Sequence, residues 1–575
     1  MRDVLCIYPP FTQPTMIYPA PYVIASTLEQ AGLSVGTLDL NLSFFRDYLD
    51  PLCAATTDGA IESAVRRCLK EIELSRSLLG SAGTRPSGRQ FFERLNSGTT
   101  YSDYDSYLAS SQAMNGALYA FGRVIGYRNL ALDTFEADAS LDEPESVAQF
   151  IRQLSSSELS SFLLARISAE EIKQDGIFCI SASFRTQTLP AILLLGLLRQ
   201  QYPQSFIAIG GASITCLRDD PLELQETCSS ADLICFGQGE HIMANLALKW
   251  FQGEEIVPTQ PNRSFIINGP RRRPRSTEIK KKARPSKQLV ALTDYIARNH
   301  GGRYCAVTPY FPLPAARGCY WNRCTFCFEY GNGSKSTMAT VEEVCEAIEL
   351  GMAYGFRHFF IGEGAVPPWM AKGIGERLHA RGLSAQWLGF FRLEKNMTPE
   401  VVEAMAGGGC RMAIYGLESA VQHLQNDMKK GVLVNKATEL LRVSAAAGVW
   451  NHVLLMFGYP TETEADAQET VAYVERYQDR IHSLAASTFT LDKSSELYLR
   501  EGALPPTVEL DERNRRGMEL FVRHRRTNAY DVEYYRAKVL QSARDNLAMQ
   551  RVPGLLLGHE LMFHERVVGP STVPC

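Results

Sequence analysis

Apolar runs alternate with an amphipathic segment over residues 1–44. VLCIYPP (4–10) is an apolar run that ends in a proline turn, APYVIASTLEQAG (20–32) has helical spacing and closes at Gly32, and SVGTLDLN (34–41) is a second apolar run. Short apolar runs favour strands, and apolar positions at the helical period favour a helix. The pattern therefore predicts a strand, a helix and a strand, which is the βαβ opening of a parallel sheet.

The pattern changes over residues 45–172 and then returns. This stretch reads as polar helical segments without strand patterns, and we interpret it as a helical insertion. Apolar runs resume with GIFCISASF (176–184), FIAIGGAS (206–213) and DLICFGQGE (232–240). A helix from about Thr188 to Gln201 follows the first of them, and the helical segment HIMANLALKWF (241–251) follows the last. Strands that alternate with helices indicate a doubly wound parallel sheet. We predict a Rossmann-like domain over residues 1–255.

Ligands of such sheets bind at the carboxyl ends of the strands. Glycines there either let a ligand approach the backbone or satisfy turns that need positive φ, and the sequence leaves both explanations open. The candidate ligand-binding residues are those at the predicted strand ends: Pro9, Pro10, Ser183, Gly210, Gly211, Gly237 and Gly239.

A further series of apolar runs, separated by helical segments, begins at Pro314. Helical segments such as 340–355 and 398–409 begin with Thr and close at glycine, as helix caps do. The succession of βα units predicts a partial (β/α) barrel over residues 306–500, with its active site at the carboxyl ends of the strands. The six runs are PAARGC (314–319), HFFIGE (358–363), SAQWLGFF (384–391), RMAIYGLE (411–418), NHVLLMFG (451–458) and LAASTFTL (484–491).

The segments on either side of the predicted barrel have another composition. Residues 256–305 contain nine basic residues between Arg271 and Lys287, in the neighbourhood of several prolines. Such a run is typical of a solvated connector, and the alternative is a docking strip for RNA or an acidic peptide. Residues 501–575 read as a C-terminal helical cap that ends at Cys575.

Composition narrows the class of protein. The chain has 575 residues, too many for one core, and 45% of them are hydrophobic, enough to fill several domains. The net charge of −4 gives no reason to expect nucleic acid or an anionic membrane as the main partner. The first residues lack the layout of a secretory signal, and Arg199 interrupts the apolar stretch LPAILLLGLL before it could span a membrane. We expect a cytoplasmic protein, in which thiols stay reduced and clustered cysteines bind metal.

The stretch RGCYWNRCTFCFEYG (317–331) carries such a cluster, with Cys319, Cys324 and Cys327 close together at the end of the first predicted barrel strand. No histidine or cysteine follows nearby, since the next cysteine is Cys345 in a predicted helix. A structural zinc site needs four ligands, whereas three thiolates can hold a [4Fe–4S] cluster with one iron left open. The sequence thus predicts an iron–sulfur site at the carboxyl ends of the barrel strands.

The motif resembles that of the radical S-adenosylmethionine (SAM) superfamily, CxxxCxΦC, on the first strand of a partial barrel. Its second half matches as Cys324-Thr325-Phe326-Cys327, while the first gap is four residues long rather than three. The resemblance implies a [4Fe–4S] cluster on the three cysteines, SAM on the open iron, and Phe326 against the adenine.

The later strand ends resemble further elements of this superfamily, in the order that it requires. Gly362 and Glu363 resemble the turn that meets the amino group of SAM, and Arg392 stands where relatives place an arginine near its carboxylate. The remaining SAM-site residues implied by the resemblance are Glu418 and Ser419 in GLES, for the ribose or amino group, and Met456 and Gly458 in MFGYPTET, for the adenine.

With the barrel identified, residues 1–255 resemble the cobalamin-binding domain that precedes the barrel in one radical SAM subclass. The resemblance implies that the seven strand-end residues named above contact cobalamin. The DxHxxG motif that supplies a histidine to cobalt is absent, and a domain that has lost cobalamin is the alternative.

The subclass implies an enzyme that cleaves SAM reductively to a 5′-deoxyadenosyl radical and methylates an unactivated carbon of a small-molecule or peptide substrate. It also implies a flavodoxin- or ferredoxin-type electron donor. The alternatives are a radical rearrangement, an epimerisation or transfer of another part of SAM, and, in another class, a sensor module that binds an iron–sulfur cluster or cobalamin. The sequence assigns no catalytic side chain.

Overall fold

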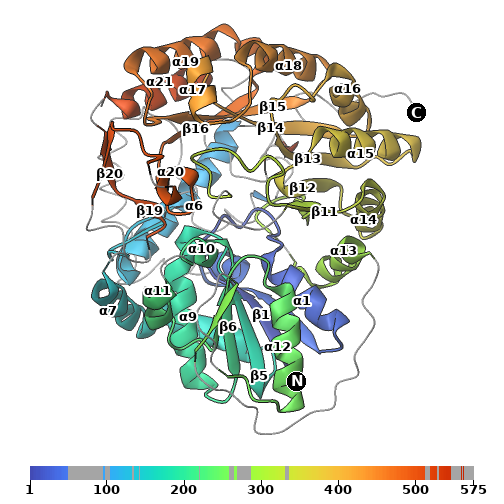
Figure 1. Ribbon diagram of the computed structural model, residues 1–575. Coiled ribbons are helices and arrows are strands. Elements are labelled where there is room, and N and C mark those ends of the chain that lie inside the picture. The colour runs from blue at the N-terminus through green and yellow to red at the C-terminus, as the bar shows by residue number, and fades with distance from the viewer. Residues whose placement is uncertain are drawn as a thin grey trace. The chain divides into compact units, whose positions relative to one another are not determined.

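The computed structural model describes much of the chain in two compact units (Figure 1). Unit 1 comprises Met1–Ser286, Arg298–Pro309 and Arg516–Glu519, and unit 2 comprises Lys287–Ala297, Tyr310–Arg515 and Leu520–Cys575. The residues described are 1–49, 95–96, 104–131, 135–141, 143–218, 221–257, 264–268, 287–302, 304–329, 336–500, 502–511, 519–526, 530–545, 559 and 561–562.

Unit 1 is built on one six-stranded sheet, in the order β2-β1-β5-β6-β7-β8. Its first five strands in this order run parallel, and β8 is antiparallel to β7. The apolar runs of the sequence supply the buried strands, whereas β8 lies in the stretch that we predicted as a linker. The strands are β1 (Arg2–Tyr8), β2 (Val35–Asp39), β5 (Ile172–Ser181), β6 (Phe206–Gly210), β7 (Leu233–Cys235) and β8 (Phe265–Ile267).

The strand order reverses between β1 and β5, which confirms the predicted doubly wound class. Helix α1 (Ala20–Gln30) leads from β1 outward to β2, and α9 (Thr188–Gln201) leads from β5 outward to β6 in the opposite direction. Because such crossovers are right-handed, α1 and α9 cover opposite faces of the sheet. Helix α12 (Glu240–Gln252) packs beside α1, and α7 (Pro144–Ser155) packs beside α9. The reversal is where ligands of this fold class bind.

The insertion is not purely helical, so the prediction that residues 45–172 lack strands is wrong. Strands β3 (Tyr127–Leu130) and β4 (Phe135–Ala137) pair as an antiparallel hairpin. With four and three residues, they are too short to leave a clear alternating pattern. Helix α2 (Leu40–Ser43) precedes the insertion, and the described helical parts within it are the π-helix η1 (Phe44–Leu49), α6 (Tyr104–Ile125), α7, and α8 (Glu158–Ser168).

Unit 2 is built on a second six-stranded sheet, all parallel, in the order β16-β15-β14-β13-β12-β9. Five strands fall on the predicted runs. The first does not, because β9 occupies Phe311–Leu313 and residues 316–317 instead form β10, paired with β11 (Thr337–Met338). Pro312 is tolerated in β9 because β9 is an edge strand. The other strands are β12 (His358–Ala365), β13 (Gln386–Phe391), β14 (Cys410–Glu418), β15 (Trp450–Phe457) and β16 (Ser483–Thr488).

Helices follow the strands of unit 2 in βα succession, as predicted for a partial barrel (Figure 1). Neighbouring helices pack along the row, and α21 (Val532–Asp545) continues it by packing on α19 and β16. Thr340 caps α14 with its side chain, as the sequence indicated, whereas Thr398 precedes α16 without a side-chain cap bond. Thr463, which the sequence analysis did not name, caps α19. The helices of the row are α14 (Val341–Ala353), α15 (Pro368–Ala380), α16 (Pro399–Gly407), α18 (Val434–Ala446) and α19 (Glu464–Arg476).

Two other expectations need correction. The segment predicted as a helical cap contains strands, because β18 (Val508–Leu510) pairs with β20 (His524–Arg526), and β19 (Phe521–Val522) pairs with β17 (Leu491–Asp492). The predicted linker ends in helix α13 (Gln288–Asn299), whose apolar face is buried. The rest of the basic run, residues 271–286, and Cys575 lie outside the described residues. Among the residues described, no helix has the length and apolar character needed to cross a membrane.

Candidate active site

The three clustered cysteines lie on one loop that follows β10 (Ala316–Arg317) rather than a strand of the large sheet. Cys319, Cys324 and Cys327 are partly exposed, whereas the eight other cysteines of the described regions are buried. Partial exposure on a loop allows thiols to take up iron, while a buried thiol acts as a small apolar side chain. The loop is therefore separated from the remaining cysteines by its environment as well as by its spacing.

The longer gap between the first two cysteines has a structural basis. Asn322 adopts a left-handed backbone conformation with φ of 44°, which asparagine tolerates better than most residues. Trp321 donates a hydrogen bond from Nε1 to the carbonyl oxygen of Lys429 at 2.9 Å. Gly431 makes room for the indole, because a Cβ there would lie 2.6 Å from Trp321. The extra residue is thus accommodated in an anchored turn.

The thiols of this loop influence one another electrostatically. Burial, with smaller contributions from the charges of Cys324, Glu329 and Cys319, raises the pKa of Cys327 to about 12. A nearby cation, such as cluster iron, favours the thiolate form of such a cysteine. No three described His, Cys, Asp or Glu side chains are arranged to ligate a single metal ion. Because a cubane cluster places each cysteine on a separate iron, the donor set fits a [4Fe–4S] cluster with an open iron.

Arg392 follows β13 and lies buried against the cysteine loop. Its Nη1 is 4.0 Å from Sγ of Cys324, its Nε donates to Glu394 at 3.1 Å, and its guanidinium lies 4.2 Å from the centre of the Trp321 ring. Its Nη2 donates to the carbonyl oxygen of Lys430. These contacts fix a buried positive charge beside Cys324, at the strand end where the sequence predicted a SAM-carboxylate ligand.

Glu418 ends β14 and forms a buried ion pair with Lys430. Lys430 Nζ lies 3.2 Å from Glu418 Oε1, and the two side chains are 8% and 14% exposed. Burial opposes the charge of Lys430, but Glu418 and Cys324 outweigh it, so the pKa of Lys430 is raised. The sequence pattern missed Lys430, which stands in the polar turn after α17 (Gln422–Asp427) and is brought to the strand ends only by tertiary folding.

Glu363 lies at the end of β12, where the backbone turns at Gly362 with φ of 95°. Its carboxylate is exposed and pairs with Nε of Arg317 at 3.3 Å. The end of β12 runs very close to the cysteine loop, because a Cβ on Gly364 would collide with the carbonyl oxygen of Gly318. The structure therefore brings Glu363 near the cysteine loop, as its predicted role requires.

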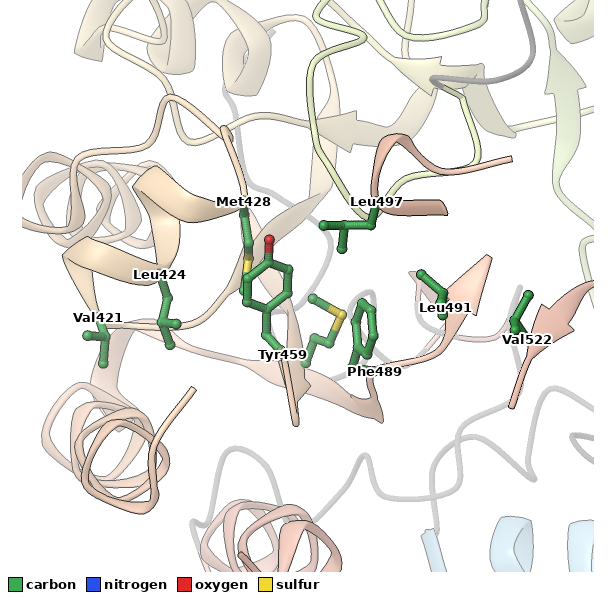
Figure 2. Close-up of a cluster of buried hydrophobic side chains, with 9 residues drawn as sticks. Val421, Leu424, Met428, Tyr459, Phe489, Leu491, Leu497 and Val522 are labelled. Carbon is green, nitrogen blue, oxygen red and sulfur yellow. The ribbon is translucent and has the colours of Figure 1, made fainter. Parts of the chain in front are cut away.

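A cluster of buried apolar side chains contacts the cysteine loop at Phe326, and Figure 2 shows this cluster. Phe326 packs on a buried cluster that includes Met456 and Tyr459, and Thr325 is hydrogen-bonded to the Tyr459 hydroxyl at 2.9 Å. The whole buried cluster is Val421, Leu424, Met428, Met456, Tyr459, Phe489, Leu491, Leu497 and Val522. This group supplies an apolar wall suited to a flat base.

Gly458 and Ser419 are both engaged within the protein. Gly458 has φ of 87°, and its N–H donates to Glu462 and, at 3.2 Å, to the Tyr530 hydroxyl. The Ser419 hydroxyl is fully buried, accepts from the Val421 N–H at 3.2 Å and bonds Thr470 on α19 at 3.2 Å. Ser419 therefore joins the end of β14 to helix α19, and its hydroxyl is engaged within the protein.

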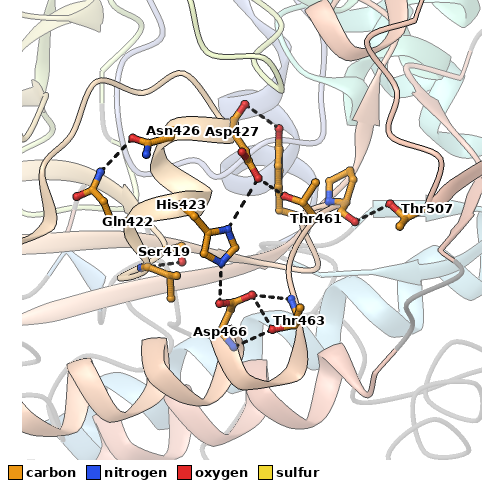
Figure 3. A network of polar contacts seen from close by, with 12 residues as sticks. Ser419, Gln422, His423, Asn426, Asp427, Thr461, Thr463, Asp466 and Thr507 are labelled. Carbon is orange, nitrogen blue, oxygen red and sulfur yellow. Dashed lines mark hydrogen bonds and ion pairs between the residues drawn. The ribbon is translucent and has the colours of Figure 1, made fainter.

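A polar network holds the strand ends behind the loop together (Figure 3). His423 Nε2 lies 2.8 Å from Asp466, and the Thr461 hydroxyl donates to Asp427 at 2.6 Å. The N–H of Thr325, within the cysteine loop, donates to the carbonyl oxygen of Met428 at 3.1 Å. The loop is thus tied to α17, and α17 is tied to the turn after β15.

The predicted ligand residues of unit 1 lie at the carboxyl ends of β1, β5, β6 and β7, where they contact other residues of the unit. Gln187 bridges them, because its amide donates to the carbonyl oxygen of Pro9 at 2.7 Å and accepts from the N–H of Ser183 at 2.8 Å. Pro10 is buried beside Pro9. The Gly237 N–H donates to Thr215 at 2.9 Å.

The glycines at these strand ends are required by the packing of the protein itself. A Cβ on Gly211, where φ is 109°, would collide with the Ala182 carbonyl group, and one on Gly239 would lie 2.7 Å from Cys235 Sγ. A Cβ on Gly210 would lie 3.1 Å from the Cys235 carbonyl oxygen. Packing within the protein therefore explains these glycines without a ligand, and the likeness to a cobalamin domain rests on the fold.

The sequence pattern did not single out one partly buried carboxyl of unit 1. Asp39 is the last residue of β2. Its carboxylate accepts hydrogen bonds from the Leu42 N–H at 2.7 Å and from the Tyr304 hydroxyl at 3.2 Å. Burial raises the pKa of Asp39 to about 6. Tyr304 is distant in sequence, so no local pattern could have indicated this pair.

Geometry and chemistry together define a partial barrel with a three-cysteine loop at the carboxyl ends of its strands. Residues 313–474 match the family model described as the radical SAM superfamily. The chain therefore carries a radical SAM domain, and the resemblance drawn from the cysteine motif is confirmed.

A curated relative is an uncharacterized methyltransferase of Pyrococcus horikoshii, 24% identical over 281 residues, which are 47% of this chain and 58% of that protein. The chain thus matches less than two thirds of that relative's length. The solved structures include the radical SAM methyltransferase TsrM of Kitasatospora setae.

One TsrM structure, with tryptophan substrate and a SAM analogue, has 14% identity and a TM-score of 0.52 over 89% of this chain and 79% of that chain. Another, with cobalamin and a [4Fe–4S] cluster, has 13% identity and a TM-score of 0.52 over 89% and 81%. At such identities the likeness is one of fold, and it extends over both units.

Proposed function

We propose that this chain is a cobalamin-dependent radical SAM methyltransferase that acts on a small-molecule substrate. The observation that carries the proposal is the loop of Cys319, Cys324 and Cys327, partly exposed and mutually interacting, beside the buried guanidinium of Arg392. A cluster with an open iron and an adjacent cation suits a cofactor with amino and carboxylate groups.

Each predicted residue has a task in this proposal. The three cysteines hold the cluster, Arg392 meets the carboxylate of SAM, and Glu363 meets its amino group. Phe326 and Met456 offer the apolar wall for adenine, next to the turn at Gly458, and Glu418 serves the ribose or amino group. Ser419 keeps only a supporting role, since its hydroxyl bonds Thr470. When bound, the cluster supplies an electron for cleavage of SAM, and cobalamin supplies the methyl carrier.

The residues of the chain place charged groups next to the cluster and exclude water from the site. Trp321 covers the guanidinium of Arg392 and keeps its charge at Cys324. The apolar cluster behind Phe326 keeps the space next to the loop dry, which strengthens every charge interaction there. The hydrogen bonds of Thr325 to Met428 and Tyr459 hold the loop in register with this wall.

For unit 1 we propose cobalamin as the ligand, on the strength of the fold shared with TsrM, which was solved with cobalamin. Pro9, Pro10, Ser183, Gly210, Gly211, Gly237 and Gly239 then form the edge of the site. Because protein atoms occupy the space next to the strand-end glycines, no reaction step is assigned to these residues. The electron donor is proposed to be a flavodoxin- or ferredoxin-type protein.

The first test removes the cluster ligands. The full-length chain is purified without oxygen, reconstituted with iron and sulfide, and its iron is counted. About four irons per chain are expected for the wild type and almost none for the variant Cys319→Ala/Cys324→Ala/Cys327→Ala. The buried Cys345→Ala is the matched control and should keep its iron. Equal iron in the triple variant and the control would contradict the proposed site.

The second test counts cobalamin in the same preparation after reconstitution with hydroxocobalamin. About one per chain supports the methyltransferase, and SAM turnover should then yield S-adenosylhomocysteine besides 5′-deoxyadenosine. Because packing within the protein explains Gly211 and Gly239 without a ligand, the second candidate is a radical SAM enzyme without cobalamin that performs a rearrangement. Iron without cobalamin would select that candidate.

A further inference from the structure

Lys430 is a second buried cation at the cysteine loop, next to Arg392. It is 6% exposed, its ammonium lies 5.7 Å from the centre of the Phe326 ring, and Phe326 lies between two of the cluster cysteines in sequence. The charge of Cys324 acts on Lys430, and the Lys430 carbonyl oxygen accepts a hydrogen bond from Arg392. Its side chain and backbone therefore both take part in the environment of the loop.

The chain is adapted to hold this ammonium in place. Glu418 pairs with it at 3.2 Å and does so from a left-handed backbone conformation, φ of 64°, which is unfavourable for glutamate. Gly416 clears the space, since a Cβ there would lie 2.7 Å from Glu418 Oε1 and 3.2 Å from Lys430 Nζ. A strained glutamate and a glycine at one ion pair indicate that the position of Lys430 matters.

The neighbouring lysine shows the contrast. Lys429 is 48% exposed and pairs with Glu496 at 2.6 Å, on the other side of the same turn. The two lysines carry the same charge one residue apart, but solvent screens Lys429 and protein surrounds Lys430. Lys429 therefore serves as an internal control for any effect of Lys430.

We propose that Lys430, seated by Glu418, makes the [4Fe–4S] cluster of this loop easier to reduce. This inference rests on the proposed function. In the reduction step the cluster gains one electron and a low-potential donor of the flavodoxin or ferredoxin class loses one, with no bond made or broken. A cluster on three thiolates is anionic and becomes more so on reduction, so a buried cation nearby stabilises the reduced form more than the oxidised form.

The test is a redox titration of the full-length chain, reconstituted without SAM, with dithionite as reductant and the reduced cluster followed by electron paramagnetic resonance. Lys430→Gln should lower the equilibrium constant for one-electron reduction about tenfold, a shift of about 59 mV to more negative potential. Lys429→Gln should leave the potential unchanged. Lys430→Arg, which keeps the charge, should stay near the wild-type value.

Glu418→Gln should shift the potential in the direction opposite to that of Lys430→Gln. It removes the negative charge that offsets Lys430, so the potential should become more positive. Equal shifts in Lys430→Gln and Lys429→Gln would overturn the inference, as would shifts of the same sign in Lys430→Gln and Glu418→Gln. If Lys430→Gln fails to take up iron, Glu418→Gln and Lys430→Arg still test the inference. An unchanged or more negative potential in Glu418→Gln would overturn the inference. Failure of the wild type to assemble any cluster would instead refute the proposed function.

Discussion

Both large sheets carry glycines at the carboxyl ends of their strands, but what approaches those glycines differs between the units. At Gly211 of unit 1 the neighbour is the backbone of Ala182, which is held by the sheet and cannot move aside. At Gly416 of unit 2 the neighbours are the tips of the Glu418 and Lys430 side chains, which can move. A glycine at a strand end thus indicates that other atoms approach its backbone closely. It does not indicate whether the packing of the fold or a charged site requires this approach.

The difference also separates the predicted binding residues of the two units. Around the cysteine loop, the predicted residues bring charge, with Arg392 beside Cys324 and Glu363 near Gly318 through the end of β12. At the edge of the sheet in unit 1, they bring mainly close packing. The candidate site in unit 2 can therefore be dissected by changing charges, and the edge of unit 1 only by changing shape.

The substitution Gly211→Ala is expected to have the largest effect on the free energy of unfolding. The added methyl group would collide with the Ala182 carbonyl group, and alanine would have to adopt φ of 109°. Overpacking and backbone strain together should lower the free energy of unfolding by about 3 kcal/mol. Thermal unfolding measures the loss, and amide hydrogen exchange at residues 206–210 locates it in β6.

Gly196→Ala is the matched control for that variant. Gly196 lies in α9 of the same unit, and a Cβ there would meet nothing within 4 Å. Alanine should stabilise the helix by about 0.5–1 kcal/mol. If both alanine variants behaved alike, the close packing described for Gly211 would be wrong.

Gly416→Ala should have a smaller effect on stability. Its Cβ would press on two flexible side-chain ends, so a loss of about 1 kcal/mol is expected, which is less than for Gly211→Ala. Iron content should be retained because the cysteine loop is untouched. A loss of stability as large as that of Gly211→Ala, measured under the same conditions, would remove the distinction between the two units.

The sequence allowed much of this architecture to be predicted, because buried parallel strands leave uninterrupted apolar runs. Helix α9 was predicted with its observed bounds, Thr188–Gln201. The first barrel strand was misplaced because FPLPAA is apolar throughout, and only pairing with β12 shows that Phe311–Leu313 is the strand. The cysteine loop stood out by spacing, whereas Lys430 reaches it through the turn after α17, a tertiary contact without a local pattern.

The last expected effect concerns how the stability of unit 1 depends on pH. Asp39 of unit 1 has its pKa raised by burial from 3.8 to about 6. A carboxyl whose folded pKa is raised favours the folded state fully below its unfolded pKa, and this contribution is lost as pH rises through the folded pKa. Between pH 4 and pH 7 the wild type should therefore lose about 1–2 kcal/mol at this position, given that the side chain is partly exposed.

Asp39→Asn should flatten this dependence, because an amide keeps the hydrogen bond from the Leu42 N–H but cannot ionise. Urea unfolding at pH 4.5 and pH 7.5 measures it, with hydrogen exchange in β2 as the local reporter. The control is Asp138→Asn, whose carboxylate is 65% exposed and pairs with Arg128 on the surface of the same unit. The control should keep the wild-type pH profile, and a variant of Asp39 that kept it as well would show that this carboxyl is solvated in the folded chain.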